Sequence, residues 1–322
     1  MKTTAIILIS LIFIGGCKKD NLPDNINYKQ EMRNFVQGIS GYAKGFKSDF
    51  LIIPQNGIEL VTAGGEENGS AETTYLNAID GHGQEDLFYG YDKDDKATPS
   101  STTNYLKSYL NISKKTGNVI LVTDYCSTHS KMDDSYSKNQ SSGYISFAAD
   151  HRELDNIPSY PSPIHNRNDS NITKFSQVKN FLYIINPTNY ASKSAFISDL
   201  SKTDYDLIIM DLFDKDGTPF TGAEVEKLKK KSTGAKRLVV CYMSIGEAEE
   251  YRYYWKSGWK TGNPDFIYKE NPNWKGNYTV KYWVKDWQDI IYGNDSSYLK
   301  KIVDAGFDGV YLDIIDAFER FE

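Results

Sequence analysis

The sequence predicts a single α/β barrel of eight βα units whose order along the chain is circularly permuted. Short β-rich apolar runs alternate with helical patterns along the 322 residues, which is typical of βα units around a parallel sheet. The helix expected at 29–44 has no strand before it, and the strand in the last segment, GFDGVYLDIIDAFERFE, has no helix after it. If these two segments meet in space, they complete one βα unit, and we expect one closed barrel.

Eight segments have the apolar, β-branched composition of strands. Starting in the middle of the chain they are 181–186, 205–214, 237–249, 278–283 and 308–316, followed by three from the front, 49–57, a weaker one within 75–90, and 118–126. Helices are predicted at 192–201, 221–231, 297–304 and 102–115. Thr221 and Glu224 form a capping-box pattern, and Gly117, Gly234 and Gly306 stand where helices should end. The Pro- and Asn-rich segment 155–170 is the clearest loop, and it joins the two groups of strands.

The first residues predict the location of the protein. Lys2 precedes an apolar stretch, 5–14, that is too short to span a bilayer and ends in Gly-Gly-Cys at Cys17. This pattern resembles a bacterial lipoprotein signal, which implies cleavage before Cys17, diacylglycerol on its sulfur and export; an ordinary secretory signal is the alternative. We therefore expect a signal peptide with a lipidated cysteine at 1–17, a tether at 18–28 and the barrel at 29–322. The expected location is the outer membrane, on its periplasmic or cell-surface face.

Composition excludes several classes of protein. A net charge of −6 and a pI near 5.4 argue against a nucleic-acid partner, which would require a basic face. Cys126 and Cys241 lie in apolar strand-like runs, so we interpret them as buried free thiols. No histidine pair has metal-ligand spacing, and we expect no metal and no cofactor. The aromatic share of 14% suits stacking against sugar rings, although an aromatic core explains it equally well.

Polar residues, mostly acidic, follow the predicted strands at their C-terminal ends, which form the active face of such a barrel. They are Asp211, Asp214, Glu247, Glu249, Asp313, Asp316, Gln55, Asn56, Asp80, Glu85 and Asp124. Any single acid could instead cap the following helix. Repelling carboxylates are costly to gather, however, unless raised pKa values or the hydroxyl and amine groups of a substrate use them. The sequence thus predicts an acidic cleft.

Several motifs carry a family resemblance. The segments VVCYMSIGEAEEYR and GFDGVYLDIIDAFE, with YDLIIMDLFD before them, resemble glycoside hydrolase family 114, the endo-α-1,4-polygalactosaminidase-like TIM barrels. The front segments FLIIPQNGIEL and IDGHGQEDLFYG resemble later strands of the same family, placed here ahead of the earlier ones. The resemblance covers nearly all of the chain after the signal, and it implies a circularly permuted TIM barrel.

The resemblance implies hydrolysis of α-1,4 links in galactosamine-type polysaccharide by two carboxyl groups. Asp313 matches the family's acid in the DGVYLD strand and Glu85 the acid of a later strand, so these two are the expected catalytic residues. In a retaining mechanism Asp313 is the nucleophile and Glu85 the general acid/base. The expected substrate-binding residues are Asp211, Glu247, Asp124, Asn56, Gln55, Tyr242, Tyr311 and Trp283.

Two departures from the family pattern bear on specificity. Better-characterised members carry Asp-Asn in the DGVYLD strand, where this chain has Asp313-Ile314. Glu85 is expected in a glycine-flanked loop, GHGQED, rather than in a continuous strand. These differences leave the preferred glycan open.

A second class of function remains possible on the sequence. A non-catalytic glycan-binding surface lipoprotein would use the same acidic, aromatic cleft to hold a sugar without cutting it. An esterase or deacetylase is disfavoured because neither GxSxG nor metal-ligand spacing occurs. The expected partners are a polysaccharide and, through the N-terminal lipid, a membrane. We expect a monomer.

Overall fold

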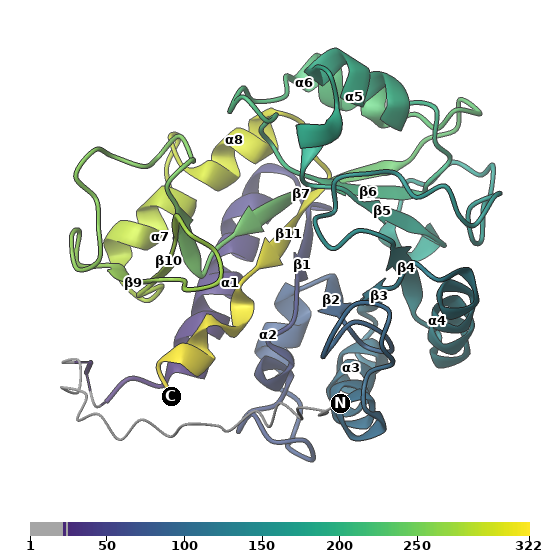
Figure 1. Cartoon of the computed structure of the whole chain (residues 1–322). Helices are drawn as coiled ribbons and strands as arrows, with labels where there is room; N and C mark the ends of the chain where they lie inside the picture. The colour runs from purple at the N-terminus through teal and green to yellow at the C-terminus, as the bar shows by residue number, and fades with distance from the viewer. Residues whose placement is uncertain (1–21, 24) are drawn as a thin grey trace, which may run out of the picture.

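The computed structural model describes residues 22–23 and 25–322, so the expected signal peptide and Cys17 lie outside the described residues. Two sheets of parallel strands form the centre of the fold (Figure 1). The larger sheet contains, in spatial order, β1 (Leu51–Pro54), β11 (Gly309–Asp313), β7 (Leu238–Ser244), β6 (Leu207–Met210) and β5 (Phe181–Tyr183). The smaller contains β2 (Gly81–Glu85), β3 (Val119–Tyr125) and β4 (Ile145–Ala149).

The two sheets meet at β1 and β2. Gln55 and Gly83 form a parallel bridge, and the backbone amide of Asn56 donates to the carbonyl of Gly83 at 2.9 Å. At the other side the rings of Phe147 in β4 and Phe181 in β5 pack with their centroids 5.8 Å apart. The strands therefore follow one another with the same direction from β5 through β11 and β1 to β4. This arrangement is consistent with a TIM-like fold.

The helices cover the outside of the sheets (Figure 1). They are α1 (Tyr28–Phe46), α2 (Thr73–Ala78), α3 (Ser100–Lys115), α4 (His129–Ser142), α5 (Lys193–Leu200), α6 (Gly222–Leu228), α7 (Lys285–Ile291) and α8 (Tyr298–Asp304), with short 3₁₀ turns η1 (Ile58–Val61), η2 (Phe175–Gln177), η3 (Pro187–Asn189) and η4 (Ile315–Arg320). The predicted capping box is confirmed, since Thr221 and Glu224 exchange hydrogen bonds at the start of α6. Sequence analysis missed α4 because HSKMDDSYSKNQSS has few apolar residues to mark a buried face. In the described part of the chain no helix has the length and apolar character needed to cross a membrane.

The prediction of a barrel strand at 278–283 was wrong. The segment forms β10 (Asn277–Val280), which pairs antiparallel with β8 (Glu247–Glu249) and β9 (Ile267–Glu270) in a small separate sheet. Its polar and apolar residues alternate as in a half-buried strand, whereas the parallel strands are buried on both faces. The position next to β3 belongs instead to β4, whose short segment ISFAA was overlooked. The loop at 155–170 is confirmed, because it contains neither helix nor strand and follows β4.

The first described helix and the last described residues lie side by side (Figure 1). The ring of Tyr28 stacks on Phe321 at 5.5 Å between centroids, and Lys29 forms an ion pair with Glu322. The hydroxyl of Tyr282 also donates to the backbone carbonyl of Tyr28 at 2.9 Å. The two segments that the sequence analysis expected to meet are therefore in contact.

Aromatic side chains fill the space between the strands below the site. The ring of Tyr311 in β11 is fully buried and packs edge-on against Tyr183 in β5, with centroids 5.2 Å apart. Gly83 in β2 leaves room for this ring, since a Cβ atom there would lie 2.1 Å from the Tyr311 hydroxyl oxygen. The lack of a side chain at Gly83 is thus a packing requirement.

We expect Gly83→Ala to destabilise the fold by about 1–3 kcal/mol, because the added methyl group must displace a buried ring. Gly41→Ala is the matched control: Gly41 lies in α1 with no atom within 4 Å of the new Cβ, and a helical Gly→Ala change favours folding. Urea unfolding of both variants measures the difference. Equal midpoints for Gly83→Ala and the unchanged protein would show that Tyr311 moves aside without cost.

Candidate active site

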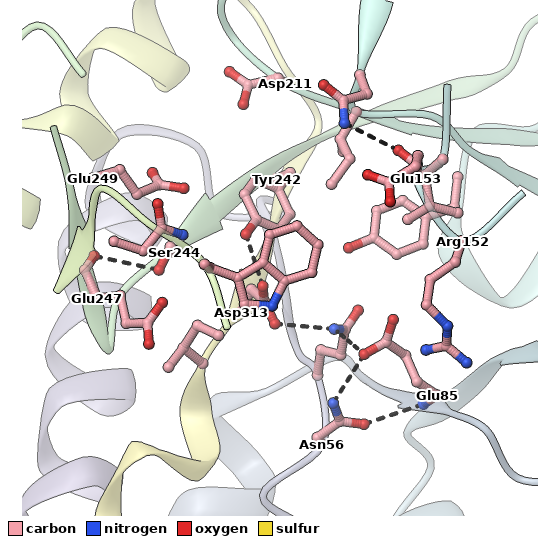
Figure 2. Close-up of a pocket in the computed structure, with 18 of the residues that line it drawn as sticks. Asn56, Glu85, Arg152, Glu153, Asp211, Tyr242, Ser244, Glu247, Glu249 and Asp313 are labelled. Carbon is pink, nitrogen blue, oxygen red and sulfur yellow. Dashed lines mark hydrogen bonds between the residues drawn. The ribbon is translucent and has the colours of Figure 1, made fainter. Parts of the chain in front are cut away.

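A hollow of about 450 Å³ lies at the C-terminal ends of the parallel strands. Glu85 ends β2, Asp313 ends β11, and Gln55 follows β1, so neighbouring strands bring the three side chains to one place. Figure 2 shows Glu85 and Arg152 on one side of Asp313 and Glu247 and Glu249 on the other. The sequence-predicted residues that line the hollow are Gln55, Asn56, Glu85, Asp211, Tyr242, Glu247 and Asp313.

Glu85 and Asp313 share one hydrogen-bond donor. The side-chain nitrogen Nε2 of Gln55 donates to Oε2 of Glu85 and to Oδ1 of Asp313, each at 2.9 Å. The two carboxylate oxygens can therefore be separated by no more than twice 2.9 Å. The structure thus brings together the two acids that the sequence analysis paired.

Glu85 is held by further donors from two directions. The hydroxyl of Tyr125 donates to Oε1, and Nδ2 of Asn56 donates to Oε2 at 3.1 Å. Asn56 has a left-handed backbone (φ 60°) and also accepts from the backbone amide of Glu85, which fixes both residues. The guanidinium of Arg152 lies 3.8 Å from the centre of the Tyr125 ring. Glu85 ends a continuous strand, so the expectation of a glycine-flanked loop was wrong.

Asp313 is oriented from both sides of its carboxyl group. The hydroxyl of Tyr242 donates to Oδ2 at 2.7 Å, opposite the Gln55 contact on Oδ1. Ile314, the next residue, has φ 57°, which is strained for a β-branched side chain. Gly246 allows the turn, because a Cβ there would lie 2.1 Å from the carbonyl oxygen of Ile314. The chain therefore maintains an unfavourable backbone directly after this acid.

Burial raises the pKa values of Asp313, Glu85 and Asp316 in the hollow. Removal from water raises the pKa of Asp313 to about 7, although the hydrogen bond from Tyr242 opposes the shift. Burial also raises the pKa of Glu85, and the charge of Asp313 raises it further. The pKa of Asp316 rises to about 7, chiefly through burial. At neutral pH the site can therefore hold ionised and protonated carboxyl groups together.

A second set of acidic residues in the hollow pairs with arginine side chains. The buried guanidinium of Arg252 bonds to Asp211 at 2.8 and 2.7 Å and to Glu249 at 2.5 Å. Glu247 accepts from Asn271 at 2.9 Å and pairs with Arg320 at 3.0 Å. Asp211 and Glu247 thus lie at the hollow as expected, but each already has a cationic partner.

We expect Arg252→Met to destabilise the protein by about 3–5 kcal/mol, because it leaves Asp211 and Glu249 as buried carboxylates without their cation. Arg167→Met is the matched control, since Arg167, in the loop at 155–170, is an exposed arginine that pairs with Asp169 and Asp204. Its ion pairs lie in water, so their loss should cost much less stability. Thermal unfolding measures both, and similar losses in the two variants would show that the buried network is not the stronger one.

Three predicted binding residues lie away from the hollow. Asp124 is fully buried and accepts from Ser135 and Asn139 of α4, because its side chain points to the opposite face of β3 from Tyr125. Tyr311 points inward but lies below the site, in the packed interior. Trp283 packs on Tyr28 and Phe321 beside α1, with centroids at 5.0 and 4.8 Å.

Sequence analysis missed several residues of the site. Tyr125, which bonds to Glu85, and Arg152, which lies on the Tyr125 ring, line the hollow together with Arg252, Tyr251 and Trp274. Tyr125 could have been found from the alternation along β3, which places it rather than Asp124 on the inner face. The others lie outside the parallel strands, where no periodicity marks the side chains that face the cleft. Within the described residues no group of three or more His, Cys, Asp and Glu side chains is arranged to hold a metal ion.

Part of the chain is similar to a known protein family. Residues 165–322, just under half of the chain, match the model of glycoside-hydrolase family GH114. This region contains Asp313 and Tyr242 but not Glu85 or Gln55.

Among curated proteins, an uncharacterized protein of Methanocaldococcus jannaschii is 41% identical over 180 residues, which is 55% of this chain and 48% of the relative. Uncharacterized proteins of Deinococcus radiodurans and Thermotoga maritima are 42% identical over 118 residues (37% of this chain, 35% of the relative) and 38% identical over 130 residues (40% and 38%). The matches span about half the length of the first relative and less of the other two. The family match therefore shows that residues 165–322 are similar to glycoside-hydrolase family GH114.

Proposed function

We propose that the protein is a glycosidase that cleaves α-1,4-linked galactosamine-type polysaccharide with Glu85 and Asp313 as its two catalytic carboxyl groups. The observation that carries the proposal is the contact of both acids with one nitrogen of Gln55. Cleavage of a glycosidic bond requires one carboxyl group that donates a proton and a second that acts on the anomeric carbon. Both acids lie at the C-terminal ends of parallel strands, where barrel enzymes place their chemistry.

The separation of the two acids favours a retaining mechanism. Carboxyl groups in retaining glycosidases lie about 5–5.5 Å apart, whereas inverting enzymes keep about 6.5–9.5 Å to admit a water molecule. The two oxygens bonded to Gln55 are at most twice 2.9 Å apart, a limit that accommodates the retaining separation. This geometry supports direct attack by one of the two acids on the sugar.

The local charges favour Asp313 as nucleophile and Glu85 as acid/base. Burial and the charge of Asp313 both raise the pKa of Glu85, which favours a protonated Glu85 beside an ionised Asp313. In the first step an Asp313 oxygen bonds to the anomeric carbon, while the Glu85 proton passes to the leaving glycosidic oxygen. In the second step Glu85 takes a proton from water, whose oxygen displaces Asp313. The hydrogen bond from Tyr242 stabilises Asp313 as the anion in between.

The unpaired acids of the hollow support an amino-sugar substrate. Asp316 and Glu153 line it, and neither forms an ion pair within the described residues, in contrast to Asp211 and Glu247. An ammonium group of galactosamine would supply the missing positive charge. We therefore assign amine binding to Asp316 and Glu153, with Asn56 and Gln55 as candidates for contacts with sugar hydroxyls.

Activity should fall on the acidic side of pH 7. The mechanism needs ionised Asp313, whose pKa is raised to about 7, so kcat/KM of the free protein should drop about tenfold per pH unit well below that value. Tyr242→Phe removes a hydrogen bond that lowers this pKa, and the acidic limb should then move to higher pH. A pH–rate profile of both proteins tests this. If the acidic limb of the profile does not move in the variant, Tyr242 does not set the pKa of Asp313.

We also propose that the barrel is closed and permuted and that a lipid attaches the protein to the outer membrane. The eight parallel strands form one closed, circularly permuted TIM barrel, which the contact of Tyr28 with Phe321 and the β1–β11 pairing support. The sequence at 1–17 supports a lipoprotein signal, with a tether at 18–28 and outer-membrane attachment through Cys17. On this proposal the barrel reaches its polysaccharide outside the inner membrane.

The test of the function is product analysis by mass spectrometry. The protein without residues 1–17, and its Asp313→Asn/Glu85→Gln double variant, are incubated with acetylated and de-N-acetylated galactosaminogalactan. Oligosaccharides released only by the unchanged protein support the proposal and give the preferred acetylation state. If both proteins bind the polysaccharide but release no oligosaccharides, the non-catalytic glycan-binding function replaces the proposal.

A further inference from the structure

The reaction hollow continues into a second one. A neighbouring hollow of about 290 Å³ shares Ile185, Asn186, Asp211, Tyr251 and Arg252 with the first. Tyr251 therefore lies where the two hollows join. The far wall of the second hollow contains Phe213 and Tyr253, whose rings pack at 5.7 Å between centroids. The cleft is thus longer than the pocket around Glu85 and Asp313.

Large aromatic side chains are exposed along this cleft. Tyr251 is 63% exposed, Trp274 55% and Tyr253 42%, although all three line one or the other hollow. Single exposed aromatic residues are common on protein surfaces. Three exposed aromatic rings on the walls of one continuous cleft are less common, because together they offer apolar ring surface to a ligand. A sugar ring presents an apolar face to such a surface and hydroxyl groups to its edges.

Hydrogen bonds orient the ring of Tyr251 and fix the backbone that carries Trp274. The hydroxyl of Tyr251 donates to Glu249, and the guanidinium of Arg252 lies 5.1 Å from its ring centre. Trp274 lies in the tight connection between β9 and β10, where its backbone bonds to Asn271 and Asn277. Asn271 in turn donates to Glu247 of the reaction hollow. The Tyr251 ring is therefore oriented before binding, and the backbone of Trp274 is fixed, which reduces the entropy lost when a ligand stacks there.

We propose that Tyr251 and Trp274 are stacking platforms for sugar rings and that the hollow beyond Tyr251 is a distal subsite of the cleft. The inference rests on the proposed function and extends it: the site binds a chain of several sugar units and prefers long polysaccharide to short oligosaccharide. Asn186 and Asp214 in the second hollow supply polar groups for the hydroxyl or amine groups of the distal unit. The binding contributed by distant units serves to hold the scissile bond at Glu85 and Asp313.

The experiment compares a long polymer with the shortest oligosaccharide that the unchanged protein cleaves. Tyr251→Ala and Trp274→Ala should each lower kcat/KM about tenfold for galactosaminogalactan, the loss of one aromatic contact, and less than about twofold for the short substrate. Tyr251→Phe keeps the ring and should retain the preference for the polymer. Phe46→Ala is the control, because Phe46 is 53% exposed at the end of α1 and lines neither hollow. It should change neither rate.

Two results would overturn the proposal. Equal losses on long and short substrates would show a general role of the two rings at the reaction site, and no loss on either would show that they contact no sugar. If the unchanged protein cleaves nothing, the catalytic function fails. The stacking role of Tyr251 and Trp274 is then tested separately, by how far each protein is retarded in gels that contain galactosaminogalactan. Weaker retardation of both alanine variants then supports them, and retardation equal to that of Phe46→Ala, or none at all, rejects them.

Discussion

Replacement of Asp313 by Asn should lower kcat by about 10⁴-fold or more, because the amide that replaces the carboxylate cannot form the covalent bond to the sugar. Asn has nearly the shape of Asp, so the protein should fold and bind glycan. It should also be more stable at neutral pH. A buried carboxyl group whose pKa is raised to about 7 destabilises the fold increasingly from about pH 4, the unfolded pKa, up to pH 7. The variant's gain in stability should therefore vanish below about pH 4.

Single-turnover kinetics and thermal unfolding across pH measure these two effects. The matched control is Asp304→Asn, which removes an exposed carboxylate that pairs with Lys300 on the surface of α8. It should change neither rate nor pH dependence. Asp313→Gly adds a chemical test, since azide can enter the space of the lost carboxylate and attack the sugar itself. Full activity of Asp313→Asn would remove Asp313 from the mechanism.

Replacement of Glu85 by Gln should lower kcat by about 10²–10⁴-fold, the usual contribution of a general acid or base. The loss should depend on the leaving group. A natural sugar alcohol needs the proton from Glu85, whereas a nitrophenolate leaves without one, so the first step is less affected for aryl glycosides. Removal of the acid should also remove the basic limb of the pH–rate profile.

Rates of polysaccharide and nitrophenyl glycoside hydrolysis by Glu85→Gln test this assignment. Glu67→Gln is the control, because Glu67 is exposed and does not line the hollow. An equal loss on both substrates would indicate that Glu85 positions the sugar rather than donating a proton. Loss of activity on both substrates as complete as in Asp313→Asn would instead indicate that Glu85 is the nucleophile.

The sequence was most informative where strand ends place side chains. Asp313 and Glu85 are more than two hundred residues apart, yet strand patterns and the family resemblance together predicted that they meet, and both contact Gln55. The C-terminal ends of parallel strands gather on one edge whatever the order of the units. Prediction of the site therefore required only the positions of the strands and their direction. Most of the predicted strand positions were correct.

The errors have identifiable physical causes. Asp124 and Tyr125 are adjacent in β3, so an error of one residue exchanged a side chain bonded to α4 for one bonded to Glu85. The segment with Trp283 has the composition of a strand, but its register in a separate antiparallel sheet depends on partners far away in the sequence. The exposed rings of Tyr251 and Trp274 lie beside short connections, whose paths no local pattern specifies.

Ile314 shows a further limit of sequence reasoning. Its left-handed backbone is one that Asn adopts with less strain than Ile, and the family pattern has Asn at this position. The surrounding contacts must impose the conformation. Composition alone would predict an extended residue here and would continue β11 past Asp313.

The central claim is that Glu85 and Asp313 form a retaining pair. Proton NMR of the products during the first minutes of hydrolysis, before the anomers equilibrate, tests it most directly. The shared contact with Gln55 suits a retaining pair, so the new reducing end should first appear as the α-anomer. Initial release of the β-anomer would contradict the account, because water would then attack the sugar directly and Asp313 would not be the nucleophile.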